Sequence, residues 1–70
     1  MANFTLIAKK SMTVTTDKGG YKIGLRERLD VIKTQTITMF DKDYIQITFL
    51  KGKTKRTFNV LSTSFISLFI

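Results

Sequence analysis

Apolar and polar residues alternate along most of this chain, which is the pattern of β-strands that have one buried face. The alternation predicts a strand over residues 4–8 and a second over residues 12–16. Threonine is abundant and proline is absent, which also favours strands. Residues 17–20, Asp-Lys-Gly-Gly, predict a tight turn because glycine supplies the positive φ angles of hairpin turns. A return strand is expected from Tyr21 onward.

The segment 26–33 fits two patterns. Leu25, Leu29 and Ile32 would share one face of a short helix, whereas Leu29, Val31 and Lys33 alternate as in a strand. We favour the strand, because residues 34–40 continue the β-branched alternation.

The next segments predict two hairpins. Residues 41–43, Asp-Lys-Asp, are expected to form a polar hairpin turn rather than a metal site, because two carboxylates are too few ligands for a divalent cation. The clearest strand follows over residues 44–50, with Ile45, Ile47 and Phe49 on one face. Gly52 marks the next turn, and residues 57–61 form the return strand.

The C-terminal residues 62–70 are predominantly apolar and admit two structures. Ser62 or Ser64 could cap a short helix, or the segment is a strand that is buried on both faces. The helix would place four apolar residues on one side: Phe65, Ile66, Phe69 and Ile70. An apolar patch this large needs a cover. We therefore expect either a tail folded back over a barrel mouth or a homo-oligomer whose interface contains Phe65, Ile66, Leu68, Phe69 and Ile70.

These elements predict a mostly β fold, with residues 1–70 forming a single small domain. The expected architecture is a small antiparallel β-barrel or a strongly twisted sheet of five to six strands, with a possible short C-terminal helix. A barrel would protect the edges that an open sheet exposes. The chain shows no internal repeat and no linker.

Composition excludes several classes of function. The chain has no cysteine and no histidine, so we expect no disulfide, no zinc site, no metal and no cofactor. Acid–base chemistry would rest on residues such as Glu27 and Asp30, and we predict that the protein is not an enzyme. The N-terminus lacks the pattern of a signal peptide, and no window holds the roughly 18 apolar residues of a membrane span. A cytoplasmic location is expected.

Charge points to a polyanionic partner. Twelve Lys and Arg against five Asp and Glu give 12 − 5 = +7. Four of the positive charges lie within six residues, at Lys51, Lys53, Lys55 and Arg56. This predicted hairpin could neutralise phosphates, and further candidates for such contacts are Lys9, Lys10, Lys22 and Lys33. The alternative interpretation is that the lysines keep a strand edge soluble.

Aromatic residues beside turns are candidates for stacking on nucleic-acid bases. Tyr21, Tyr44 and Phe40 each border a predicted turn, and an exposed ring beside lysines could stack on an unpaired base. Phe40 is better explained by packing in the core or at its rim. The two tyrosines are therefore the stacking candidates.

Residues 40–58, from Phe40 through the basic hairpin to Phe58, resemble the central hairpins of SH3-like small barrels of the KOW and Tudor kind. In those barrels a strand that ends in an aromatic residue meets a short glycine-containing turn and a basic return strand. The resemblance implies a binding module, for nucleic acid or for a protein segment, without catalysis.

Two functions follow as hypotheses. The first is binding of DNA or RNA with modest sequence specificity, through phosphate contacts of the hairpin and stacking on Tyr44 or Tyr21. The second is a small protein-interaction module, of the kind that phages and mobile elements encode as inhibitors or scaffolds. That module would bind an acidic protein surface or self-assemble through its apolar C-terminus.

Overall fold

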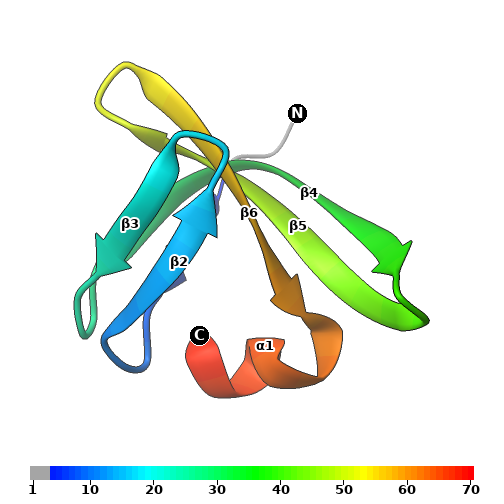
Figure 1. Ribbon diagram of the computed structural model, residues 1–70. Helices are drawn as coiled ribbons and strands as arrows, with labels where there is room; N and C mark the ends of the chain where they lie inside the picture. Colours follow the sequence, from blue (N-terminus) through cyan, green and yellow to red (C-terminus); the bar gives the residue numbers. More distant parts are fainter. Residues whose placement is uncertain (1–3) are drawn as a thin grey trace.

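The computed structural model describes residues 4–70, which form six strands and one short helix (Figure 1). The predictions that concern residues 1–3 lie outside the described residues. The elements are β1 (Phe4–Ile7), β2 (Met12–Thr16), β3 (Gly19–Ile23), β4 (Arg28–Met39), β5 (Lys42–Lys51), β6 (Thr54–Leu61) and α1 (Ser62–Leu68). Within this part of the chain no helix is long and apolar enough to cross a bilayer.

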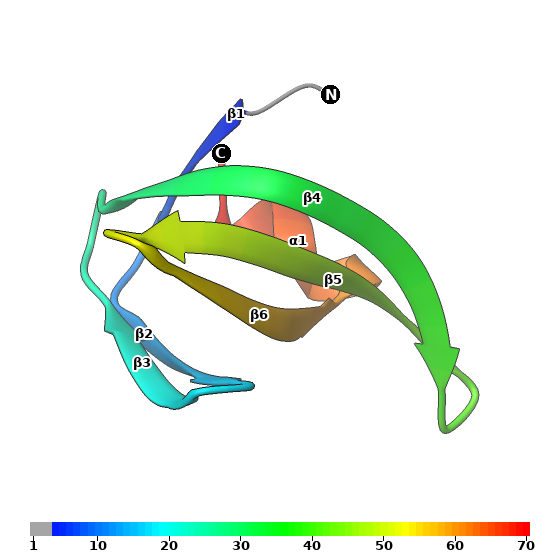
Figure 2. The ribbon, with the colours of Figure 1, turned by 90° about the horizontal axis from the view of Figure 1, so that it is seen from above.

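The strands form two antiparallel sheets around a shared core. One sheet has four strands in the order β1-β4-β5-β6, and the other is the β2-β3 hairpin (Figures 1 and 2). The mostly β prediction is confirmed, and residues 28–33 are strand rather than helix. Among residues 4–70 neither strand of the β2-β3 hairpin pairs with a strand of the larger sheet, so the fold is two twisted sheets rather than one closed barrel.

The long hairpin β4–β5 curves strongly and extends past the other strands (Figure 2). Its register shifts between Val31 and Lys33, where β4 carries a bulge. A bulge increases the local twist of a strand and bends it. The inner part of this hairpin, near Val31 and Phe49, contributes to the core, whereas its outer part, residues 38–43, extends past the last residue that pairs with β6 and forms an arm.

The core is built from alternate residues of both sheets. Ile47 and Phe49 are fully buried on the face of β5 that alternation predicts, and Ile45 packs against them. An aromatic series crosses the core, with ring centroids 5.3 Å apart for Tyr21 and Phe49, 5.6 Å for Phe49 and Phe58, and 6.2 Å for Phe58 and Phe69. Such tilted and edge-to-face pairs add to the stabilisation that burial alone provides.

The C-terminal segment folds back onto the body, as one of the two sequence predictions has it. Helix α1 begins after Leu61, which makes no side-chain capping hydrogen bond, so the predicted serine cap is wrong. The side chain of Phe69 is only 2% exposed, and its backbone forms an antiparallel β-bridge with Ala8. The Lys9 N–H also donates to the Leu68 carbonyl over 2.8 Å.

The predicted apolar face of the C-terminal segment is correct for Phe65 and Phe69 and wrong for Ile66 and Ile70. Phe65, Leu68 and Phe69 pack inward, whereas Ile66 is 77% and Ile70 is 65% exposed. The helix ends at Leu68, and Phe69 has extended backbone angles (φ −135°, ψ 153°). Side chains after Leu68 therefore alternate as in a strand, which turns Ile70 away from the core.

The β4–β5 turn lies one residue earlier than predicted. Met39 pairs with Lys42, so the turn residues are Phe40 and Asp41, while Lys42 and Asp43 belong to β5. Both turn residues have positive φ, 53° and 62°, as a type I′ turn requires. The prediction misplaced this turn because neither Phe40 nor Asp41 is glycine or asparagine, the residues that usually mark positive φ. Gly52, with φ 62°, begins the β5–β6 turn as predicted.

Candidate nucleic-acid interface

Two hairpins bring their basic residues to one end of the molecule. The β5–β6 turn follows Lys51, which pairs with Thr54, and the β2–β3 turn contains Lys18. The Asp17 N–H donates to the Thr57 carbonyl over 3.1 Å, and the Thr57 N–H donates to Asp17 Oδ1 over 3.0 Å. This pair of bonds fastens the two hairpins together.

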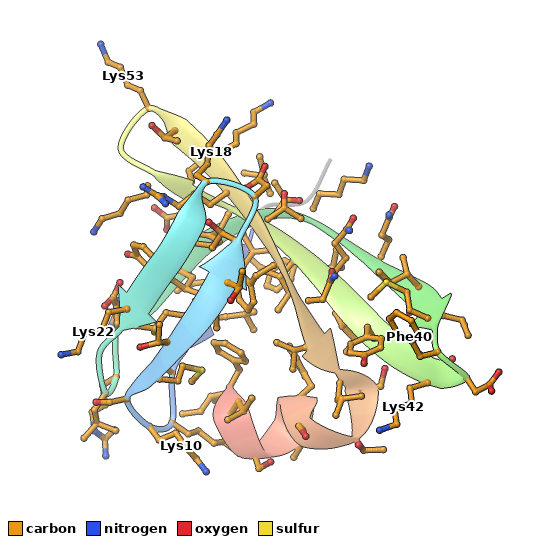
Figure 3. All side chains as sticks on the ribbon, viewed as in Figure 1. Lys10, Lys18, Lys22, Phe40, Lys42 and Lys53 are labelled. Carbon is orange, nitrogen blue, oxygen red and sulfur yellow. The ribbon has the colours of Figure 1, made fainter. Side chains whose placement is uncertain are left out.

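We call this region the basic end, and Figure 3 shows Lys18 and Lys53 there. It comprises Lys18, Lys51, Lys53, Lys55 and Arg56. Sequence reasoning missed Lys18. Its turn was predicted correctly, but only the contact between Asp17 and Thr57, which lie 40 residues apart, places that turn beside the other hairpin.

The four predicted basic residues do not share one face. Arg56 pairs with the buried Phe49 and points to the same inner side, as does Lys51 two residues further along β5. Lys55 pairs with Leu50 and points to the opposite face. Lys53 occupies the turn itself. The hairpin therefore carries positive charge on both faces and at its tip.

Tyr21 orients the two inner cations. The guanidinium carbon of Arg56 lies 5.4 Å from the Tyr21 ring centroid, and the Lys51 Nζ lies 5.9 Å from it. Both distances are within the range of cation–π attraction. The same ring packs on Phe49. Phe49, Arg56 and Lys51 therefore all lie beside the ring of Tyr21, which stays partly exposed.

Glu27 fixes the tyrosine from the β3–β4 turn. Its Oε2 accepts a 2.7 Å hydrogen bond from the Tyr21 hydroxyl, and its Oε1 accepts one of 2.9 Å from the Gly24 N–H. The Gly24 N–H and the tyrosine hydroxyl hold the pKa of Glu27 below its ordinary value. Partial burial, together with the hydrogen bond to Glu27, raises the pKa of Tyr21. At neutral pH Glu27 is therefore ionised and accepts both hydrogen bonds, and the Tyr21 hydroxyl keeps the proton that it donates.

Positive charge at this end is left without full compensation. Asp17 and Glu27 bring two negative charges to this end, fewer than its five cations, and both accept hydrogen bonds from the neutral donors described above. The Arg56 Nε is buried and has no hydrogen-bond partner among the described residues. An unsatisfied donor of this kind costs free energy unless a ligand, a water or an ion supplies the acceptor.

The structure does not bring Tyr44 to the basic end. Tyr44 and Lys51 lie seven positions apart on β5, or about 23 Å of extended chain. Phe40 lies still further out, at the tip of the arm (Figure 3). Its side chain is 89% exposed, so the prediction that Phe40 packs in the core or its rim is wrong. The turn position forces the side chain into solvent.

The other predicted contributors are dispersed. Figure 3 shows Lys10 and Lys22 away from the basic end. Lys9 donates its Nζ to the Ile66 carbonyl, next to the helix, and Lys33 is exposed on β4. Phe69, one of the C-terminal residues that were predicted to form an oligomer interface, is buried in the core of the monomer. Residues 4–70 contain no cluster of three or more metal-ligating side chains.

Comparison of the chain with protein-family models, with curated proteins and with solved structures finds no match. A function for this protein therefore has to be inferred from its side chains and their arrangement.

Proposed function

We propose that this protein binds nucleic acid through phosphate contacts at the basic end. The observation that carries the proposal is the arrangement of Arg56 and Lys51 over Tyr21, with Glu27 holding the tyrosine. A guanidinium that is already held in one orientation loses little entropy when it binds a phosphate, and its planar fork matches the phosphate oxygens.

The contacts would depend little on base sequence. Tyr44 and Phe40 lie at the far end of β5, and the ring of Tyr21 already contacts Phe49, Arg56 and Lys51, so phosphate contacts outweigh base stacking at the basic end. Contacts with phosphate position a protein on nucleic acid, whereas contacts with base edges specify a sequence. Binding is therefore driven by the release of counterions and weakens with salt.

A kinship with SH3-like small barrels is part of the same proposal. Three features support it: the meander of β4, β5 and β6, the short helix that follows, and the bridge from Phe69 back to Ala8. Small barrels of that kind serve as binding modules, and a binding role without catalysis also agrees with a chain that lacks histidine and cysteine.

The test compares two variants of equal net charge. The first carries Lys51→Gln, Lys53→Gln and Arg56→Gln at the basic end. The second carries Lys10→Gln, Lys22→Gln and Lys42→Gln, three exposed lysines at other places (Figure 3). Each variant has a net charge of 7 − 3 = +4. Binding to a short fluorescein-labelled DNA duplex is measured by anisotropy at low salt, after circular dichroism has verified the fold of both.

The basic-end variant should lose about 100-fold in affinity, because about three charged contacts disappear, and the control variant should lose much less. Equal losses in the two variants would mean that net charge alone attracts DNA. In that case the basic end would not be a binding site.

A further inference from the structure

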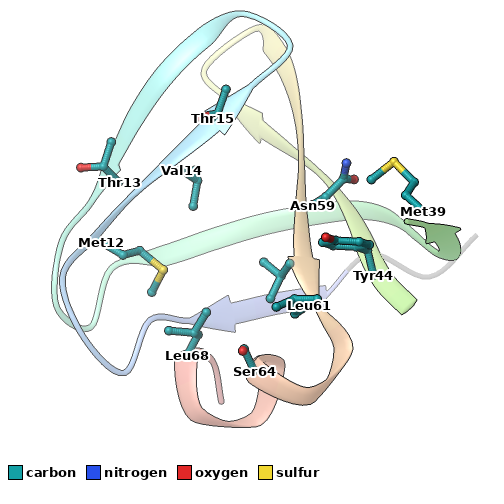
Figure 4. Close-up of a pocket in the computed structure, with 11 residues that line it drawn as sticks. Met12, Thr13, Val14, Thr15, Met39, Tyr44, Asn59, Leu61, Ser64 and Leu68 are labelled. Carbon is teal, nitrogen blue, oxygen red and sulfur yellow. The ribbon is translucent and has the colours of Figure 1, made fainter. Parts of the chain in front are cut away.

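A groove runs between β2 and β6, and no residue of the basic end lines it (Figure 4). Its volume is about 600 Å³ and no charged side chain lines it. We call it the β2–β6 groove, and it is lined by Met12, Thr13, Val14, Thr15, Met39, Tyr44, Asn59, Val60, Leu61, Ser64 and Leu68. An uncharged groove is notable in a protein with a net charge of +7.

The two walls of the groove are sheet edges. Strand β6 is the outer strand of the larger sheet, and β2 pairs only with β3. The edges meet at one end, where Asp17 and Thr57 exchange hydrogen bonds, and the groove opens beyond that contact. The two strands run in opposite directions (Figure 1).

Backbone groups along both walls face the groove without partners. The N–H and C=O of Thr57 point away from β5, toward Asp17, so those of Asn59, two residues on, point the same way. In β2, Thr16 pairs with Gly19 beside the turn, which leaves Thr13 and Thr15 directed outward. Within residues 4–70 these outward groups make no backbone hydrogen bond across the groove.

We propose that the β2–β6 groove binds an extended peptide segment of a partner protein by strand addition. The added strand would run antiparallel to one wall and parallel to the other, and its backbone would supply the missing hydrogen bonds. Its alternate side chains would lie on an apolar floor formed by Val14, Val60 and Leu68. Met12 and Met39 at the sides adapt readily to side chains of different shape.

The chemistry of the partner segment follows from the uncharged walls of the groove and from the positive net charge of the protein. Side chains that enter an uncharged groove should be apolar at alternate positions. Residues that flank the segment experience the positive field of the protein, so acidic flanks accelerate and strengthen binding. The expected ligand is a short extended segment of alternating apolar residues with Asp or Glu at its ends.

A random dodecapeptide library displayed on phage, selected on the immobilised full chain, tests the proposal. Selection is run in parallel on the Asn59→Pro variant. Proline removes the outward N–H and is tolerated on the open side of an edge strand. Asn59→Ala is the matched control, because it deletes the same side chain and keeps the N–H.

The selected peptides should alternate apolar residues and carry acidic ends. A synthetic copy should bind the wild type and Asn59→Ala equally, and Asn59→Pro about tenfold more weakly. N-methylation of alternate peptide residues should have a similar effect. The amide of Asn59 should gain protection from hydrogen exchange when the peptide binds.

Three results would overturn the proposal. In the first, selection on the wild-type chain enriches peptides no more than selection on Asn59→Pro does. In the second, the selected peptides bind Asn59→Ala and Asn59→Pro equally. Alternatively, sedimentation could show a dimer that Asn59→Pro dissociates, in which case a second copy of the chain occupies the groove. Thermal unfolding of each variant verifies that it is folded, so that a change in binding is not mistaken for a loss of structure.

Discussion

At the scale of single residues, the basic end depends on a neutral and an acidic side chain as much as on its cations. Tyr21 carries Arg56 and Lys51 on its ring, and Glu27 holds the tyrosine hydroxyl. These residues come from three segments of the chain. Their cooperation is a property of the fold, because no local pattern in the sequence links Tyr21 with Arg56.

Glu27→Gln should destabilise the protein in a pH-dependent way. Two hydrogen bonds lower the pKa of Glu27 from its ordinary value of 4.5, so its carboxylate contributes stability above that pH and loses the contribution as pH falls through the folded-state value. We expect a loss of about 1 kcal/mol at neutral pH, since the site is partly solvated. Urea unfolding at neutral pH and below pH 4.5 checks this.

The difference between wild type and Glu27→Gln should shrink in acid, because the wild-type carboxyl is then protonated. Asp30→Asn, on an exposed position of β4, is the control and should change little at either pH. A difference between wild type and Glu27→Gln that stays constant down to strongly acidic pH would show that the two hydrogen bonds do not depend on the charge of Glu27.

At the scale of elements, the alternation of side chains predicts the strands well and the turns only in part. The turns at Gly19 and Gly52 follow from glycine at positive φ. The Phe40-Asp41 turn does not, since two non-glycine residues adopt the left-handed conformation there. Such a conformation is unfavourable for a bulky residue and persists because the long β4–β5 ladder fixes the register.

Replacing Phe40-Asp41 by Asn-Gly should stabilise the protein by about 1–2 kcal/mol, because Asn-Gly is the preferred type I′ pair. Chemical denaturation measures the change. Gly52→Ala is a useful counterpart, because the added Cβ meets nothing within 4 Å while φ is +62°. It should destabilise by about 1 kcal/mol through backbone strain alone. An Asn-Gly variant no more stable than the wild type would show that the turn is not strained.

Phe69 should be the most sensitive residue of the C-terminal segment. It is buried against Phe58 and Phe65, so Phe69→Ala should cost about 3–5 kcal/mol. Ile66→Ala, on an exposed position of the same segment, should change stability by less than about 0.5 kcal/mol. Thermal unfolding of the two variants compares them. A larger effect from Ile66 would instead indicate that this face is covered, as in an oligomer.

The helix itself could be predicted only as one of two possibilities. The apolar residues of the segment 62–70 are adjacent in sequence, at 65–66 and 68–70, so periodicity does not distinguish a helix from a buried strand. The segment contains both, a short helix and then an extended end at Phe69. That switch decides which apolar residues are covered, and it depends on the contact with Ala8 far away in the sequence.

At the scale of the whole molecule, the cluster of positive charge at the basic end is separate from the open strand edges of the β2–β6 groove. The basic end gathers five cations from two hairpins, whereas the β2–β6 groove has no charged lining. The net charge of +7 and the basic hairpin are evident from the sequence. The groove is not, because it exists only where two sheets diverge from the contact between Asp17 and Thr57. The two proposed sites therefore differ in chemistry, one basic and the other uncharged.

The central claim, that the basic end binds phosphates, is tested most directly by the salt dependence of DNA binding. Affinity for a short duplex is measured over a range of salt concentrations for wild type and for Lys51→Gln/Arg56→Gln. Each lost phosphate contact should reduce the slope of log K against log salt by about 0.9. A slope smaller by about 1.8 in the double variant supports the account. An unchanged slope would contradict it.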